Sequence, residues 1–172
     1  LRQDQGLDKG YITDWSYGVD ETLTLLIPNF KGGSSYGSFG ENSESFKLIK
    51  ENQGKAKARK ALASLPSYWG KQPFTSGPFY AGACMIFLFI LGLFIVKGRT
   101  KWWLLTITIL AIVISWGRNF QWFSNLVIDY LPGFKKFRDI KMILIVADFA
   151  IPMLGILAFN ELIQGNIERN TL

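Results

Sequence analysis

Three long apolar runs in the second half of the chain most constrain what it can fold into: Phe79–Val96, Trp102–Trp116 and Met142–Phe159. The first has no charged residue and the third has one, Asp148. Their apolar residues occur all round the helix rather than along one face. Crossing a hydrocarbon layer of about 30 Å takes about 20 such residues, so the middle run, about 22 Å long as a helix, needs flanking residues. The pattern predicts an α-helical membrane protein with about three transmembrane helices; the alternative is a buried hairpin in a soluble domain.

The charge balance favours anionic partners. The net charge of +6 suits anionic membrane lipids or phosphate groups. Nucleic acid is the alternative for a basic chain, but the Lys and Arg residues are scattered among the apolar runs and form no reading motif, so we expect no nucleic-acid partner. There is no histidine, which excludes a histidine proton shuttle and a Ser-His-Asp triad. We expect no metal and no cofactor.

The polar first part of the chain divides from the apolar second part near residue 78. We expect residues 1–78 to form a mixed, water-exposed region, residues 79–160 the transmembrane region, and residues 161–172 a polar tail; the count of Lys and Arg in the loops is too even to assign the side of the membrane on which residues 1–78 lie. Within the first part, Thr22–Pro28 is β-prone or interfacial by composition. The chain starts at Leu1 without a signal-peptide pattern. Either residues 1–78 stay in the cytoplasm, or the chain is cut from a longer protein with earlier spans; we expect the second.

A basic helix is predicted over 41–65, ended by Pro66. A weak apolar stripe runs through Phe46, Ile49, Ala58, Ala61, Leu62 and Leu65, and the opposite face carries Lys55, Lys57, Arg59 and Lys60. That face is either solvated or lies on anionic headgroups.

The segment between the second and third runs, 117–141, combines an amphipathic pattern with a basic cluster. Apolar residues at helical spacing predict a helix in the membrane plane: Phe120, Phe123, Val127, Tyr130 and Leu131. The cations follow after Pro132-Gly133: Lys135, Lys136, Arg138 and Lys141. Guanidinium makes paired hydrogen bonds to phosphate oxygens, so this loop is the strongest candidate for binding a lipid phosphate. The alternative is a cationic collar that only anchors the third span.

Acidic residues mark two further places. Asp148 lies about 10 Å deeper than Lys141 along a helix, where an ionisable group indicates function or a structural hydrogen bond to another span that this chain does not contain. Near the start of the chain, Asp14 and Glu21 accompany Trp15 and Tyr17. Aromatic rings stack on sugar rings while carboxylates accept hydroxyl protons, so this cluster could line a sugar site.

Three stretches resemble a known family: DWSYGVDETLTLLIPNFKGG (Asp14–Gly33), YWGKQPFTSGPFYAGA (Tyr68–Ala83) and WGRNFQWFSNLVIDYLPGFKKFRD (Trp116–Asp139). Together they are similar to the YfhO-like polytopic membrane proteins of bacteria, in the version found in Bacteroidetes. That family looks like the GT-C glycosyltransferases, which transfer a sugar from a polyprenyl-phosphate carrier to an acceptor outside the cytoplasmic membrane. The resemblance implies a multi-pass protein of the bacterial cytoplasmic membrane, with residues 1–78 and 117–141 outside and 97–101 inside.

The resemblance also implies roles for particular residues. The main catalytic base of GT-C enzymes follows their first span, so it is expected outside this chain, with Asp14 and Glu21 as weak candidates within it. The expected substrate-binding residues are Arg138, Lys135, Lys136, Arg118, Trp15, Tyr17 and Trp69. The expected partners are membrane lipids, a polyprenyl-phosphate-linked sugar and the remaining transmembrane helices of the full-length protein. A non-catalytic scaffold, or a transporter of lipid-linked sugars, is the alternative function.

Overall fold

The computed structural model describes residues 6–36, 39–75 and 79–165, and every regular element in this part of the chain is helical. The α-helical class is therefore confirmed. The α-helices are α1 (Lys9–Ile12), α2 (Glu44–Gln53), α3 (Lys55–Ser64), α4 (Ala83–Ile95), α5 (Thr100–Ser115), α6 (Gln121–Tyr130) and α7 (Leu144–Gln164). Short 3₁₀ helices connect them: η1 (Asp20–Leu25), η2 (Gly117–Phe120), η3 (Phe134–Lys136) and η4 (Ile140–Ile143).

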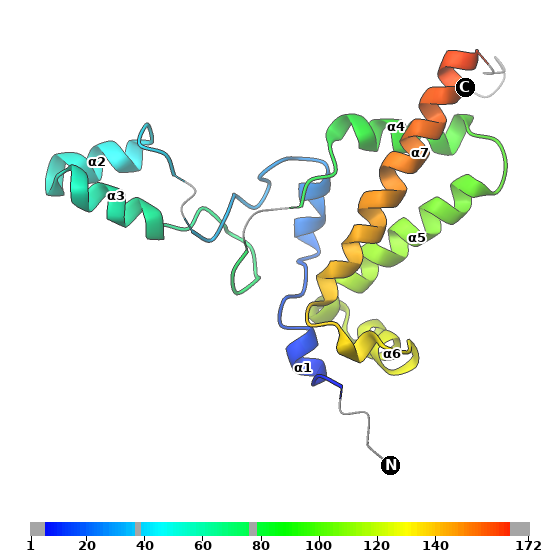
Figure 1. The fold of residues 1–172 in the computed structure, drawn as a ribbon, viewed down its shortest axis with the longest axis horizontal. Coiled ribbons are helices and arrows are strands. Elements are labelled where there is room, and N and C mark those ends of the chain that lie inside the picture. Colours follow the sequence, from blue (N-terminus) through cyan, green and yellow to red (C-terminus); the bar gives the residue numbers. More distant parts are fainter. Residues whose placement is uncertain (1–5, 37–38, 76–78, 166–172) are drawn as a thin grey trace.

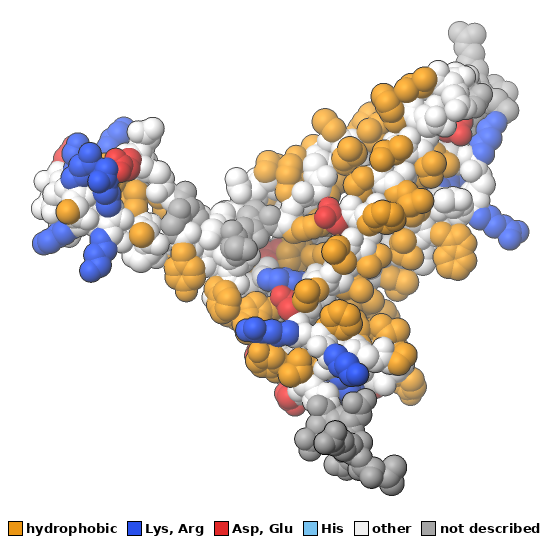
Figure 2. Space-filling view, viewed as in Figure 1, with side chains coloured by type: hydrophobic (Ala, Val, Ile, Leu, Met, Phe, Trp, Pro, Cys, Tyr) orange, Lys and Arg blue, Asp and Glu red, His pale blue; other side chains and the backbone are white. Residues whose placement is uncertain are grey.

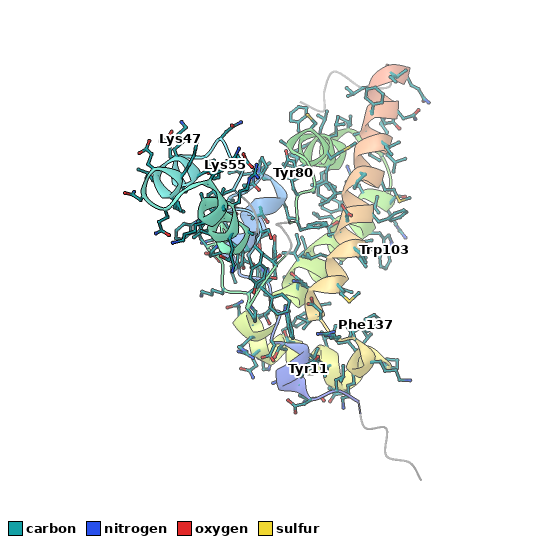
Figure 3. All side chains as sticks on the ribbon, turned by 60° about the vertical axis from the view of Figure 1, so that its left-hand side comes forward. Tyr11, Lys47, Lys55, Tyr80, Trp103 and Phe137 are labelled. Carbon is teal, nitrogen blue, oxygen red and sulfur yellow. The ribbon has the colours of Figure 1, made fainter. Side chains whose placement is uncertain are left out.

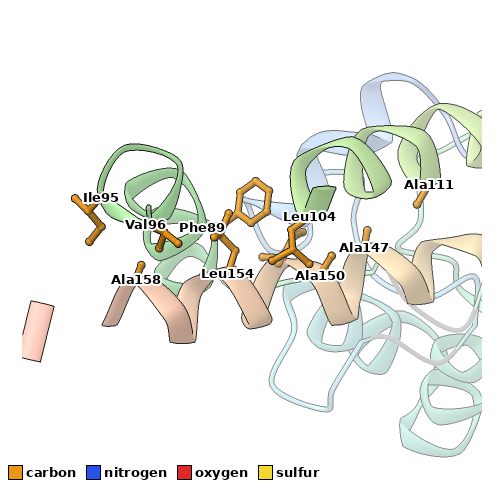
Figure 4. Packing of buried hydrophobic residues seen from close by; sticks show 10 residues of the cluster. Phe89, Ile95, Val96, Leu104, Ala111, Ala147, Ala150, Leu154 and Ala158 are labelled. Atoms are coloured by element: carbon orange, nitrogen blue, oxygen red, sulfur yellow. The ribbon is translucent and has the colours of Figure 1, made fainter. Parts of the chain in front are cut away.

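The main body is built around α7, which packs against both α4 and α5 (Figure 1). Small residues on α7 let the neighbouring helices approach, since Ala147, Ala150 and Ala158 are fully buried. Larger side chains fill the spaces between the helices, with Phe89 of α4 and Leu104 of α5 directed at this surface (Figure 4). Helix contacts made through small residues are common where lipid supplies no hydrophobic driving force.

The lengths of the apolar helices differ from the expected three spans. Of the described helices, one is long and apolar enough to cross a membrane by itself, the 25-residue helix Ile140–Gln164. Helix α5 passes the same test only together with the following Gly117–Tyr130, and the two are bent by 106°. Helix α4 has 13 residues, about 20 Å, because the chain is not helical before Ala83. The count of three spans is thus not confirmed.

The exterior of the main body is strongly apolar. Figure 2 shows hydrophobic side chains covering the α4–α7 side, with few charged groups among them. Large apolar side chains that are more than half exposed include Phe87, Phe94, Trp103, Ile145, Phe149, Ile156 and Ile163. An exposed apolar surface of this kind marks a contact with lipid or with other protein.

Two predictions for the first part of the chain are corrected. The β-prone segment Thr22–Pro28 is not a strand, because Asp20–Leu25 forms the 3₁₀ helix η1. The Thr24 hydroxyl stabilises this turn by donating to the Glu21 carbonyl at 2.6 Å. The single helix expected over 41–65 is a hairpin of α2 and α3, broken at Gly54 with a φ of 84° that favours glycine.

The α2–α3 hairpin has a small core of its own and projects from the main body (Figure 1). Phe46, Ala58 and Leu62 are buried in it, as the apolar stripe predicted. Ser43 caps α2 by accepting a hydrogen bond from the Phe46 N–H at 3.2 Å.

The C-terminal tail, expected to be polar from residue 161, begins inside a helix. Helix α7 continues to Gln164 and ends at Gly165, whose φ of 64° is the left-handed conformation of a helix C-cap. The rest of the expected tail lies outside the described residues.

The crossing of α4 and α7 can be tested at Gly92. A Cβ added there would lie 2.9 Å from the Leu154 Cγ, so we expect Gly92→Leu to lower the free energy of unfolding by about 1–3 kcal/mol through overpacking. Unfolding in detergent micelles, followed by circular dichroism, measures this. The matched variant Cys84→Leu adds bulk to an exposed position of the same helix and should change stability little; equal losses would contradict the close crossing.

Candidate functional site

Two neighbouring cavities open where α7 begins. The first, the Trp15 cavity, has a volume of about 440 Å³ and is lined by Trp15, Phe74, Thr75, Arg138, Asp139, Lys141 and Met142. The second, the Glu21 cavity, has about 250 Å³, and its wall includes Tyr17, Glu21, Gln72, Phe79, Ile145 and Asp148. Thr75, Lys141 and Met142 line both cavities. One cleft therefore joins a charged, aromatic compartment to a compartment with an apolar wall.

The corner between α5 and α6 positions the N-terminal segment that forms one wall of this cleft. Gly117 has a φ of 46°, and a Cβ there would lie 2.1 Å from the Ser16 Oγ, so this turn requires glycine. The Arg118 N–H donates to the Ser16 Oγ at 2.7 Å, and the Tyr17 N–H donates to the Ser115 carbonyl at 2.8 Å. These bonds fix Trp15 and Tyr17 relative to the helices.

In the Trp15 cavity, the guanidinium carbon of Arg138 lies 5.6 Å from the centre of the Trp15 ring. The edges of Tyr11 and Phe74 meet the same indole, with centroids 5.9 and 5.5 Å away. Figure 3 shows Tyr11 and Phe137 at this end of the molecule, far from Lys47 of the hairpin. A guanidinium held against an aromatic face keeps its N–H edge available for a carboxylate or phosphate.

Glu21 is the buried charge of the site, with 2% of its surface exposed. Its Oε1 accepts hydrogen bonds from the Tyr68 hydroxyl and from the Lys71 N–H at 3.2 Å. Its Oε2 accepts from the Gly18 N–H at 3.1 Å and from the Gln72 Nε2 at 2.8 Å. Four donors fill the four lone-pair positions of a carboxylate, which offsets the cost of burying its charge.

Gln72 connects this carboxylate to the start of α7. While its Nε2 donates to Glu21, its Oε1 accepts from the Lys141 ammonium at 2.6 Å. Lys141 also lies 3.6 Å from the Asp139 carboxylate. Lys141 is thereby held in the wall that the two cavities share.

The structure divides the basic cluster that the sequence singled out. Arg138 and Lys141 line the Trp15 cavity, whereas Lys135 and Lys136 line a separate depression beside Asp129 and Pro132. Lys135 lies 3.7 Å from Asp129, which is also bound by Lys9 at 2.6 Å and has its pKa lowered chiefly by that hydrogen bond. The predicted pairing of Arg138 with Lys135 or Lys136 is thus not formed within one cavity.

The other predicted site residues lie at or beyond the rim. Arg118 donates to the Asp14 carboxylate at 2.5 Å on the surface, and neither residue lines the cleft. Trp69 is 79% exposed and lines neither cavity. Asp148 is exposed on α7 and borders the Glu21 cavity; the structural hydrogen bond expected for it is to a span outside this chain and stays a prediction.

Sequence reasoning missed Gln72, Phe74 and Asp139 as parts of the site. Gln72 contacts Glu21 and Lys141 across 51 and 69 positions of the chain, a spacing that follows no local pattern. Asp139 did carry a signal, because an Asp just before an apolar helix is typical of an N-cap. It accepts from the Lys141 N–H at 2.9 Å and so starts η4.

Comparison with known proteins adds no relative: no family model, no curated protein and no solved structure matches the chain. Within residues 6–36, 39–75 and 79–165, no group of three or more Cys, Asp or Glu residues is placed to hold a metal ion. Among the described residues, the cleft offers three cations, Arg138, Lys141 and Lys31, of which Lys31 is paired with Asp20. It also offers the aromatic wall of the Trp15 cavity and the Asp139 carboxylate, a set that suits a ligand bearing both an anionic group and hydroxyls.

Two tyrosines of the site, the buried Tyr17 and the half-buried Tyr68, make stability depend on pH. Burial raises the pKa of Tyr17 to about 12, and burial together with the hydrogen bond to Glu21 raises the pKa of Tyr68. A phenol whose folded pKa is raised stabilises the fold below its unfolded pKa of about 10 and loses that contribution as pH rises further. We therefore expect the free energy of unfolding to fall between pH 10 and about 12.

Equilibrium denaturation at pH 7 and pH 11 measures this decline. Tyr17→Phe removes one of the two phenols and should make the decline smaller. Tyr130→Phe, at a position that is 81% exposed, should retain the wild-type decline. An identical pH dependence in all three proteins would contradict the effect.

Proposed function

We propose that this chain is a segment of a multi-pass protein of the bacterial cytoplasmic membrane, and that it binds a polyprenyl-phosphate-linked sugar for transfer to a cell-envelope acceptor. Two lines support the proposal: the resemblance of three stretches to the YfhO-like, GT-C-like proteins, and the cleft at the start of α7. In such a transfer an acceptor hydroxyl forms a bond to the sugar C1 while the bond to the carrier phosphate breaks. Cations beside the leaving phosphate stabilise the charge that develops on it.

The observation that carries this proposal is the place of Arg138. Its guanidinium lies over Trp15 in an open cavity, and the apolar exterior of α7 begins close by at Ile145 and Phe149. A phosphate bound by Arg138 would thus have a place for its sugar in the Trp15 cavity. Its hydrocarbon chain would follow the apolar wall towards α7.

A membrane arrangement with α7 crossing the bilayer accounts for the helix lengths. The bend of 106° after α5 would then place α6 along the interface, where its row Trp122, Leu126 and Tyr130 is exposed. Aromatic residues in such a row favour the headgroup layer. The short α4 would complete its burial against lipid and the remaining helices of the full-length protein.

The non-catalytic alternative is favoured because both weak candidates for a catalytic base, Asp14 and Glu21, are already engaged by other residues. Asp14 is paired with Arg118, and Glu21 accepts four hydrogen bonds. Neither of these two carboxylates is thus left to act as the base, and the resemblance implies that the main base of a transferase lies outside this chain. A protein without such a base would act as a scaffold or a transporter of lipid-linked sugars.

Cysteine labelling tests the orientation. In the full-length protein with Cys84→Ser, we expect Lys136→Cys to react with a membrane-impermeant maleimide in intact cells, because it lies on the same loop as Arg138 of the cleft, two residues away, and that loop faces outward. Thr100→Cys, in the hairpin at the other end of α5, should react only after permeabilisation. Labelling of position 136 only after permeabilisation would overturn the outward cleft.

Arg138→Ala tests the donor site. In the full-length protein we expect it to reduce transfer from a polyprenyl-phosphate-linked sugar about 10- to 100-fold, the cost of losing hydrogen bonds between charged groups. Arg99→Ala removes an exposed arginine of the opposite hairpin and should leave transfer unchanged. Full activity of Arg138→Ala at normal expression would remove Arg138 from the mechanism.

A further inference from the structure

We infer that Lys141 is the second phosphate-binding cation of the cleft, and that Gln72 and Glu21 are positioning residues that hold it there. This inference rests on the proposed function, because it concerns the anionic group of the same ligand. The sequence favoured Lys135 or Lys136 as the partner of Arg138 and named Lys141 only as a member of the basic cluster. We assign the role to Lys141 instead.

Lys141 has the position that the role requires. It lines both cavities together with Met142, and it shares the Trp15 cavity with Arg138. A ligand with its phosphate between the two cations would extend into both compartments. Lys135 and Lys136 line another depression and neither of the two cavities of the cleft.

The Lys141 side chain is also held in one position, unlike a lysine side chain that extends into solvent without a partner. A lysine side chain loses up to about 2 kcal/mol of rotamer entropy when it is ordered, and here the Gln72 Oε1 orders it at 2.6 Å before any ligand arrives. The Asp139 carboxylate lies 3.6 Å from the same ammonium. An ammonium has three donors, so at least one N–H remains for a phosphate oxygen.

Glu21 acts on Lys141 through Gln72. An amide side chain can present either its oxygen or its nitrogen, and the buried Glu21 carboxylate accepts only, so it takes the Gln72 Nε2 and turns the Oε1 towards Lys141. Reversing the amide would set two acceptors against each other at Glu21 and two donors at Lys141. The remaining lone pairs of Glu21 are used by Tyr68, Gly18 and Lys71, which is why we assign it positioning and not proton abstraction.

A double-mutant cycle in the full-length protein tests the inference, with farnesyl phosphate as the probe and farnesol as its phosphate-free counterpart. Binding to the detergent-solubilised protein is measured by tryptophan fluorescence. We expect Lys141→Met to reduce the preference for farnesyl phosphate over farnesol about tenfold. Gln72→Met, which keeps the side-chain length without the amide, should reduce it less. The control Lys136→Met should leave the preference unchanged.

The double variant separates positioning from general damage. If Gln72 acts through Lys141, adding Gln72→Met to the Lys141→Met protein should not reduce the preference for farnesyl phosphate any further. A further reduction as large as that caused by Gln72→Met alone would overturn the positioning role. Lys141→Arg keeps a cation and should restore part of the preference. If thermal unfolding shows that the Gln72→Met protein is not folded, Gln72→Leu takes its place in the cycle.

The outcomes also distinguish this inference from the proposed function. If the wild-type protein binds farnesyl phosphate no better than farnesol, the phosphate site itself is absent and both fail. If the wild-type protein prefers the phosphate and Arg138→Ala abolishes that preference while Lys141→Met retains it, the proposed function stands and the role of Lys141 is overturned.

Discussion

The buried carboxylate of Glu21 is the constraint on which the arrangement of the site depends. A charge that is removed from water must be fully hydrogen-bonded or the fold loses stability. The four donors come from the turn before η1 and from Tyr68, Lys71 and Gln72. Satisfying one side chain thus joins segments about 50 positions apart, and Gln72 extends the link to α7.

A second constraint is the sharp corner between α5 and α6. The turn at Gly117 exposes backbone groups that a continuous helix would have paired, and residues 13–22 supply partners for several of them. The Arg118 N–H donates to the Ser16 hydroxyl at 2.7 Å, and the Ser115 carbonyl accepts from the Tyr17 N–H at 2.8 Å. Side chains of the corner add two further bonds, from Asn119 to the Tyr17 carbonyl and from the Trp116 indole to the Thr22 hydroxyl, both at 2.9 Å. In the main body, the polar side-chain contacts between distant segments are therefore concentrated at one end of α7, while the sides of α4, α5 and α7 remain apolar. This separation is what a protein at a membrane surface needs, and it motivates our proposal.

The basic cluster after α6 shows why neighbouring cations in a sequence need not act together. Gly133 takes a φ of 83° and starts the 3₁₀ turn η3, after which the chain is extended at Phe137. Lys135 and Lys136 consequently lie on the side of Asp129, and Arg138 lies on the side of Trp15. Three residues further on, η4 places Lys141 beside Arg138. The combination of Arg138 and Lys141 is a product of two short turns.

The sequence by itself determined the helical class, the apolar runs that became α4, α5 and α7, the amphipathic α6 and the candidacy of Trp15 and Arg138. These follow from composition and from the helical period, which act within one or two turns of chain. The break at Gly54 and the 3₁₀ helix η1 were missed, because short segments satisfy several local patterns equally. Only the tertiary structure decided that the Glu21 carboxylate accepts four hydrogen bonds, that Asp14 pairs with Arg118, and that Lys141 rather than Lys135 lines the same cavity as Arg138. Each of these depends on donors and acceptors brought together from distant segments, and hydrogen-bond satisfaction in a buried site is a property of the folded chain.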